Sequence, residues 1–180
     1  MTENKKFDKN EPILFEVENA GLALLSPWLP LLFAMLGYLN ESRKDLKDDE
    51  SRIRAIFLLQ YIVYGEEREY RETELVFNRL LVGLPQHIPI PKQLALTDEE
   101  KQTADNLLNN IKFSWPKISN ISMRAFQYNF IYRIGRLEQQ EEKWMLTMEE
   151  KTHDILLKTI PWNFRQISLP WLKEYLQVMW

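Results

Sequence analysis

An almost wholly apolar stretch over residues 20–39 dominates the hydropathy pattern of this chain, and it contains no charged side chain. A helix of that length would cross a hydrocarbon core of about 30 Å. Ser26 followed by Pro27 is instead typical of a helix start, because a serine can cap free N–H groups and proline fits the first helical position. The pattern therefore predicts a tight turn and a buried helix over 27–39, too short to span. A membrane anchor over 20–39 is the alternative.

The remaining periodicity predicts a mainly helical fold with a small β component, an α+β class. A short strand is expected over 13–17, and alternation over 143–149 predicts a strand that pairs with 136–138 in a C-terminal β-hairpin. Apolar positions at intervals of three and four predict the helices, which are expected over 51–64, 73–82, 97–113 and 119–134, with Ser51, Thr97 and Ser119 or Asn120 at starts and Gly65, Gly83 and Gly135 at ends.

The connections indicate how the chain is organised. Residues 1–11 are polar, and we expect a flexible N-terminus there. Three prolines within 84–96 predict an extended connector. The C-terminal end is aromatic and is expected to be ordered. Residues 12–180 are therefore predicted to form a single compact, globular domain, and 180 residues suffice for a stable core without disulfides or metals.

Composition excludes several classes of function. The formal net charge is −3 and acids interrupt every basic stretch, so no nucleic-acid partner is expected. With no cysteine there is no disulfide framework and no thiolate chemistry, which is compatible with the cytoplasm. Acids separate the early lysines from the apolar stretch, which argues against a secretory signal. We expect a cytoplasmic protein without a membrane partner.

Candidate chemistry is sparse. The two histidines, His87 and His153, lie far apart in sequence, and no spacing typical of a zinc site occurs. Five isolated glycines cannot build a phosphate-binding loop, so we expect neither a cofactor nor a metal. His153 beside Asp154 leaves a hydrolase that uses these two residues as an alternative. It is the weaker one, because neighbouring residues on a helix do not face each other. The chain is predicted not to be an enzyme.

Tryptophan is the most unusual component. Four of the six tryptophans adjoin a proline, at Trp28, Trp115, Trp162 and Trp171. Core packing at rigid corners is one explanation, since each indole can bury on the order of 200 Å². The other is an exposed docking surface, because tryptophan is enriched at interface hot spots.

Several ordered motifs over about residues 12–180 resemble the contractile injection system tape measure family. They are Asn19-Ala20-Gly21-Leu22, Ser26-Pro27-Trp28-Leu29-Pro30, Arg54-Ala55, Leu58-Leu59-Gln60-Tyr61, Gly65-Glu66, 78–85 (NRLLVGLP), Trp115-Pro116, Gly135-Arg136-Leu137, Trp144, 154–157 (DILL), Pro161-Trp162 and Leu169-Pro170-Trp171.

The resemblance implies a non-enzymatic component of a phage-tail-like contractile machine that binds tube, baseplate or cap proteins and helps set or initiate tube and sheath length. Longer family members carry extra sequence before this region, which suggests that the region anchors or initiates assembly and does not itself act as a ruler. It also supplies candidate interaction residues, which are Asn19, Pro27, Trp28, Arg54 and Trp171. The particular partner, the oligomeric state and the docking surface stay open.

Overall fold

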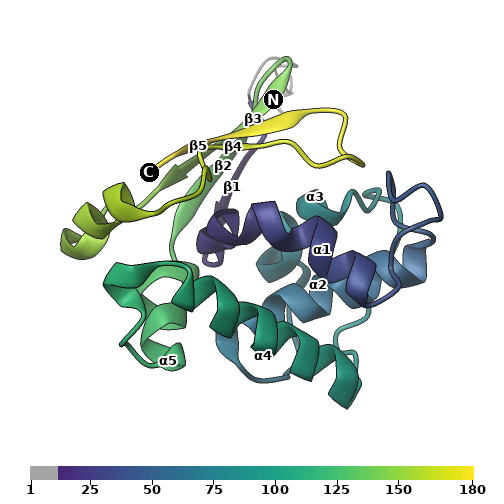
Figure 1. Ribbon diagram of the computed structural model, residues 1–180. Coiled ribbons are helices and arrows are strands. Elements are labelled where there is room, and N and C mark those ends of the chain that lie inside the picture. Colours follow the sequence, from purple (N-terminus) through teal and green to yellow (C-terminus); the bar gives the residue numbers. More distant parts are fainter. Residues whose placement is uncertain (1–11) are drawn as a thin grey trace, which may run out of the picture.

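The computed structural model describes residues 12–180, and the predicted flexible segment 1–11 lies outside them. A twisted sheet covers one side of a helical layer, which gives an α+β fold (Figure 1). The helices are η1 (Ala20–Trp28), α1 (Leu29–Met35), α2 (Asp49–Tyr64), η2 (Glu72–Leu75), α3 (Val76–Val82), α4 (Asp98–Phe113), η3 (Pro116–Ile118), α5 (Met123–Phe126), η4 (Gln127–Ile131) and η5 (Thr152–Thr159). The strands are β1 (Leu14–Val17), β2 (Gly135–Gln139), β3 (Lys143–Met148), β4 (Gln166–Ile167) and β5 (Tyr175–Met179).

The sheet confirms the predicted N-terminal strand and C-terminal hairpin and joins them. Its strand order is β1-β2-β3-β5-β4, with β3 and β5 parallel and the other pairs antiparallel. Leu137, Leu146 and Val178 face the core, while Arg136 and Thr147 alternate with them on the outer face. This period-two alternation is what one solvated and one buried face require.

The apolar stretch over 20–39 lies inside the fold. It begins as the 3₁₀-helix η1, which contacts β4 and η4, and continues as the seven-residue α1. Leu22, Leu24 and Leu32 are completely buried. Among the described residues, no helix has both the length and the apolar character needed to cross a membrane.

The predicted cap of this stretch is wrong in detail. Pro27 lies within η1, and the α-helix begins two residues later, at Leu29. The Leu29 N–H donates to the backbone oxygen of Ser26, so Ser26 contributes its carbonyl group. The break in the stretch was predictable from Ser26-Pro27, but a 3₁₀ turn leading into the helix was not.

Most other helix ends agree with the sequence. Helix α2 begins at Asp49, two residues before the predicted start at Ser51, because the Asp48 side chain caps it by accepting a hydrogen bond from the Ser51 N–H; Gly65 ends that helix as predicted, with φ of 71°. Thr97 and Glu100 form the predicted capping box of α4. Residues 84–96 contain no helix or strand, as the prolines predict.

The predicted helix over 119–134 is the main error. Neither Ser119 nor Asn120 is the cap; Ser122 caps α5, and after one π-helical segment the helix ends at Ile131. Gly135 is therefore the first residue of β2 and not a helix end. A Cβ at Gly135 would lie 2.6 Å from Cβ of Ala20, so the glycine permits a close contact between β2 and η1.

Candidate functional site

Asn19, the first of the five candidate residues, belongs to a buried amide cluster. Its Nδ2 donates to Gln60 Oε1 at 2.8 Å and also to Asn78 Oδ1. Asn78 Nδ2 in turn donates to Gln60 Oε1 at 3.1 Å and to the backbone oxygen of Ile56 at 3.0 Å. The cluster joins the end of β1 to α2 and α3. Asn19, Gln60 and Asn78, which all occur in the resembling motifs, thus act together inside the core.

Arg54 forms a second internal contact. Its Nε and Nη2 each lie 2.6 Å from a different carboxylate oxygen of Glu100, and the Tyr38 hydroxyl also donates to that carboxylate. Burial favours a raised pKa for Glu100, but hydrogen bonds from Arg54, Tyr38 and the Thr97 N–H outweigh it and lower the pKa to about 2. This ion pair fastens α4 to α2.

The tryptophans combine packing with a polar anchor. Trp28 packs edge-on against Trp162, with ring centroids 4.5 Å apart, and the Trp162 indole N–H donates to the backbone oxygen of Leu24 at 3.0 Å. The Trp171 indole N–H donates to the backbone oxygen of Leu81 at 2.8 Å. A hydrogen-bond acceptor of this kind is expected where an indole is buried. Trp162 and Trp171 thus attach the C-terminal segment to the helical layer.

The five candidates therefore do not form one patch. Pro27 and Trp28 lie together near the surface, beside Leu31 and Met35, whose exposed fractions are 52% and 54%. Asn19 is buried, and Arg54 and Trp171 make the internal contacts described above. A docking role for these residues stays a prediction; Pro27 is exposed, while Trp28, Arg54 and Trp171 are half-buried.

His153 and Asp154 both lie against Arg133, whose Nη2 is 3.3 Å from His153 Nε2 and 2.7 Å from Asp154 Oδ1. Arg133, which is completely buried, holds the Asp154 carboxylate through two hydrogen bonds of 2.7 Å, and the Trp180 indole lies 3.2 Å from the same carboxylate. The His153 Nε2 lies 3.0 Å from the backbone oxygen of Asn129. The two side chains share no hydrogen bond, so the hydrolase alternative lacks the acid–base pair on which it depended.

The Arg133–Asp154 pair instead links η5 and the chain end to the segment before β2. Burial favours a raised pKa for Asp154, but hydrogen bonds from Arg133 and from the Lys151 N–H outweigh it and lower that pKa. Sequence reasoning missed Arg133 as a central residue. Its signal was a lone cation between apolar residues, Ile131 and Ile134, where an unpaired charge would be costly to bury.

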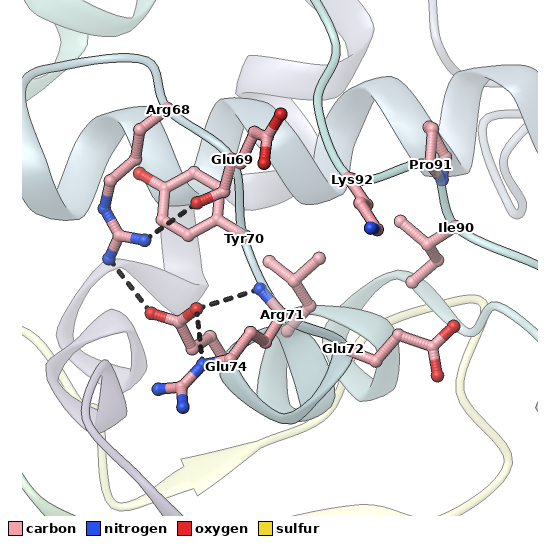
Figure 2. A pocket seen from close by; sticks show the side chains of 10 residues that line it. Arg68, Glu69, Tyr70, Arg71, Glu72, Glu74, Ile90, Pro91 and Lys92 are labelled. Carbon is pink, nitrogen blue, oxygen red and sulfur yellow. Dashed lines mark hydrogen bonds and ion pairs between the residues drawn. The ribbon is translucent and has the colours of Figure 1, made fainter.

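A charged cleft of about 600 Å³ lies between η2 and residues 90–92 (Figure 2). Glu74 is central to it. Its carboxylate accepts a hydrogen bond of 3.0 Å from Arg68 and one of 2.9 Å from the Arg71 N–H. Burial opposes ionisation, but these bonds lower the pKa of Glu74 overall. Arg68 also lies 4.0 Å from the centroid of the Tyr70 ring. These charges compensate one another, which indicates a structural arrangement.

A second concave region follows β1, and we call it the β1 groove. Its wider part measures about 620 Å³ and its narrower part about 170 Å³, and the two share Glu16 and Thr73. The wider part is lined by Leu14, Phe15, Glu16, Glu72, Thr73, Val76, Arg79, Gln86, His87, Ile88 and Pro89, and the narrower part by Glu16, Val17, Glu18, Asn19, Tyr64, Arg71, Thr73 and Glu74. Strand β1 forms one wall, and η2, α3 and the connector form the other.

Over residues 12–180, no three side chains of His, Asp or Glu are grouped so that they could hold a metal ion. The described polar groups mainly fasten one element to another. Besides the charged cleft, two open features of the surface are the Pro27–Trp28 region and the β1 groove.

Fold and site together define an α+β protein whose buried polar clusters serve structure. Comparison with family models identifies the family: the model of the contractile injection system tape measure protein matches residues 2–180, and the chain belongs to this family. The match begins ten residues earlier than the region over which the motifs were recognised. No curated protein and no solved structure matches the chain. The chain is thus a structural component of a contractile injection system.

Proposed function

We propose that the region over residues 12–180 anchors or initiates tail assembly by binding tube, baseplate or cap components, and that it does not measure length by its own extension. The observation that supports this is the collapse of all its elements onto one hydrophobic cluster. Its longest helices, α2 and α4, have sixteen residues each, or about 24 Å of helix. A folded chain of this size has a radius of gyration of roughly 16 Å.

The proposal includes a non-enzymatic role and assembly in the cytoplasm. Three partly or largely buried carboxylates, those of Glu74, Glu100 and Asp154, are held by arginines in the ion pairs described above. A carboxylate held in this way has a low pKa and is a poor general acid or base at neutral pH. We therefore propose that the surface of the protein serves to bind other proteins.

Deletion of the gene tests the proposal. We expect particles to be absent or to have abnormal lengths by electron microscopy, and we expect the unaltered chain supplied in trans to restore them. Particles of normal number and length after deletion would overturn the proposal.

A further inference from the structure

We propose that the free edge of β1 binds an extended strand of a partner protein, in which apolar and basic residues alternate. The inference deepens the proposed function, on which it rests for the nature of the partner as another tail component. The physical mechanism is strand addition, in which main-chain hydrogen bonds supply affinity and alternate side chains supply specificity.

The hydrogen-bonding pattern of the sheet leaves one edge of β1 open. Among residues 12–180, β2 is the one strand that pairs with β1, and the Gln139 N–H donates to the backbone oxygen of Ile13 at 3.0 Å. Because antiparallel pairs alternate along a ladder, Phe15 and Val17 also bond to β2, while the N–H and C=O groups of Leu14 and Glu16 point away from it. Over residues 12–180, no hydrogen bond joins these outward groups to η2, α3 or the connector.

The β1 groove lies along this open edge and has two chemically different sides. Phe15, Val76 and Ile88 are half-buried in it and pack against the hydrophobic core. An added strand would place every second side chain toward them, which favours apolar residues at those positions. The space of about 620 Å³ between β1 and the connector is large enough for such side chains.

The other side of the groove carries more acidic than basic residues. Glu16 of β1 and Glu18 just after it lie on one wall and Glu72 lies on the opposite one, while Arg71 and Arg79 also line the groove and Arg136 is the cross-strand neighbour of Glu16. None of these three carboxylates forms an ion pair within the described part of the chain. The Arg79 guanidinium donates to the backbone oxygens of Pro85 and Ile88 and holds the connector. Basic side chains at the alternate positions of an added strand would therefore meet unpaired carboxylates.

The buried end of the groove also favours a basic side chain on the added strand. Asn19 lines the narrower part, and its Oδ1 has no hydrogen-bond donor among residues 12–180. A lysine or arginine that enters there carries donors and no acceptor, so it could satisfy this oxygen. An acidic side chain would add a second acceptor.

Charge also decides against a second copy of this chain as the occupant. Two β1 strands paired edge to edge in antiparallel fashion would bring Glu16 and Glu18 of both copies together. Like charges directly opposite each other destabilise a strand pair, and charged residues are a common protection of sheet edges against self-association. A basic partner removes this penalty, whereas a second copy imposes it.

Binding of synthetic peptides to the unaltered protein tests the inference. The probe is a short, blocked peptide that alternates lysine and valine, and the controls are a glutamate–valine peptide and a scrambled lysine–valine peptide. By titration calorimetry we expect saturable binding of the alternating basic peptide, with affinity at least tenfold above both controls. No saturable binding of this peptide would overturn the inference.

Backbone methylation distinguishes strand addition from simple charge attraction. Methylating the peptide N–H groups at alternate positions blocks one edge of the peptide strand and leaves the other edge free. We expect one of the two alternate sets to abolish binding and the other to preserve it. Equal affinity of both methylated peptides would show charge attraction only and would contradict the proposed mode.

Protein variants locate the site. Glu16→Lys should weaken the peptide about tenfold, because it places a like charge at the open edge. The matched control Glu142→Lys makes the same change in the exposed turn between β2 and β3 and should leave affinity unchanged. Equal weakening by both variants, or a dimer that Glu16→Lys dissolves, would refute the assignment. If gene deletion gives abnormal particles but the peptide does not bind, this inference is wrong and the proposed function stands.

Discussion

Gly21→Ala should destabilise the protein severely, although the change adds a single methyl group. An ideal Cβ at this position would lie 1.9 Å from the backbone oxygen of Phe130 and 2.5 Å from Cα of Ile131. Both obstacles are backbone atoms, so η1 and η4 would have to separate. Overpacking in a core typically costs 1–3 kcal/mol, and a displaced backbone belongs at the top of that range, at about 3 kcal/mol.

Chemical denaturation followed by circular dichroism measures this cost. With a urea m-value of about 2 kcal/mol per molar, a loss of about 3 kcal/mol lowers the midpoint by about 1.5 M. Gly37→Ala is the matched control, because Gly37 has φ of 70° but no atom within 4 Å of the added Cβ. Its cost comes from backbone conformation alone and should be about 1 kcal/mol. A smaller midpoint shift for Gly21→Ala than for Gly37→Ala would refute the close-contact explanation.

Two further predictions concern the buried ion pairs. The pKa of Glu100 is lowered from 4.5 to about 2, so its ionised form stabilises the fold above about pH 4.5, and about 3 kcal/mol is lost as the pH falls to about 2. Urea titrations across that range should show a shallower loss for Glu100→Gln, and an unchanged slope would contradict the pairing. Arg133→Met should cost about 3–5 kcal/mol by leaving Asp154 unpaired, while Asp154→Leu added to it should recover part of the loss. A double variant no more stable than Arg133→Met would show that the pair is not the cause.

Local signals predicted most of the fold. The capping box at Thr97, the glycines after α2 and α3, and the alternation over 143–149 each depend on neighbours within a few residues. Tertiary contacts overrode the local pattern between 119 and 135. There the periodicity continues to Ile134, but burial of Arg133 and the contact of Gly135 with Ala20 require the chain to leave the helix earlier.

The site was less predictable because it depends on strand order. Nothing in residues 13–17 distinguishes an edge strand from a central one; the open outer groups of β1 follow from its place at the end of the strand order within residues 12–180. The motif residues were recognised as a set, yet their roles emerged from contacts between distant segments. Asn19 and Asn78 meet across 59 positions of sequence, a relation that local patterns do not encode.

The length distribution of sheaths is the most direct test of the central claim, that this region acts through its folded surface and not as a ruler. A flexible neutral segment inserted in the exposed loop over 41–44 lengthens the chain without touching the core or the β1 groove. Electron microscopy of particles from deletion strains carrying this variant should show the same lengths as the unaltered chain produces. Sheaths that lengthen in proportion to the insertion would contradict the claim.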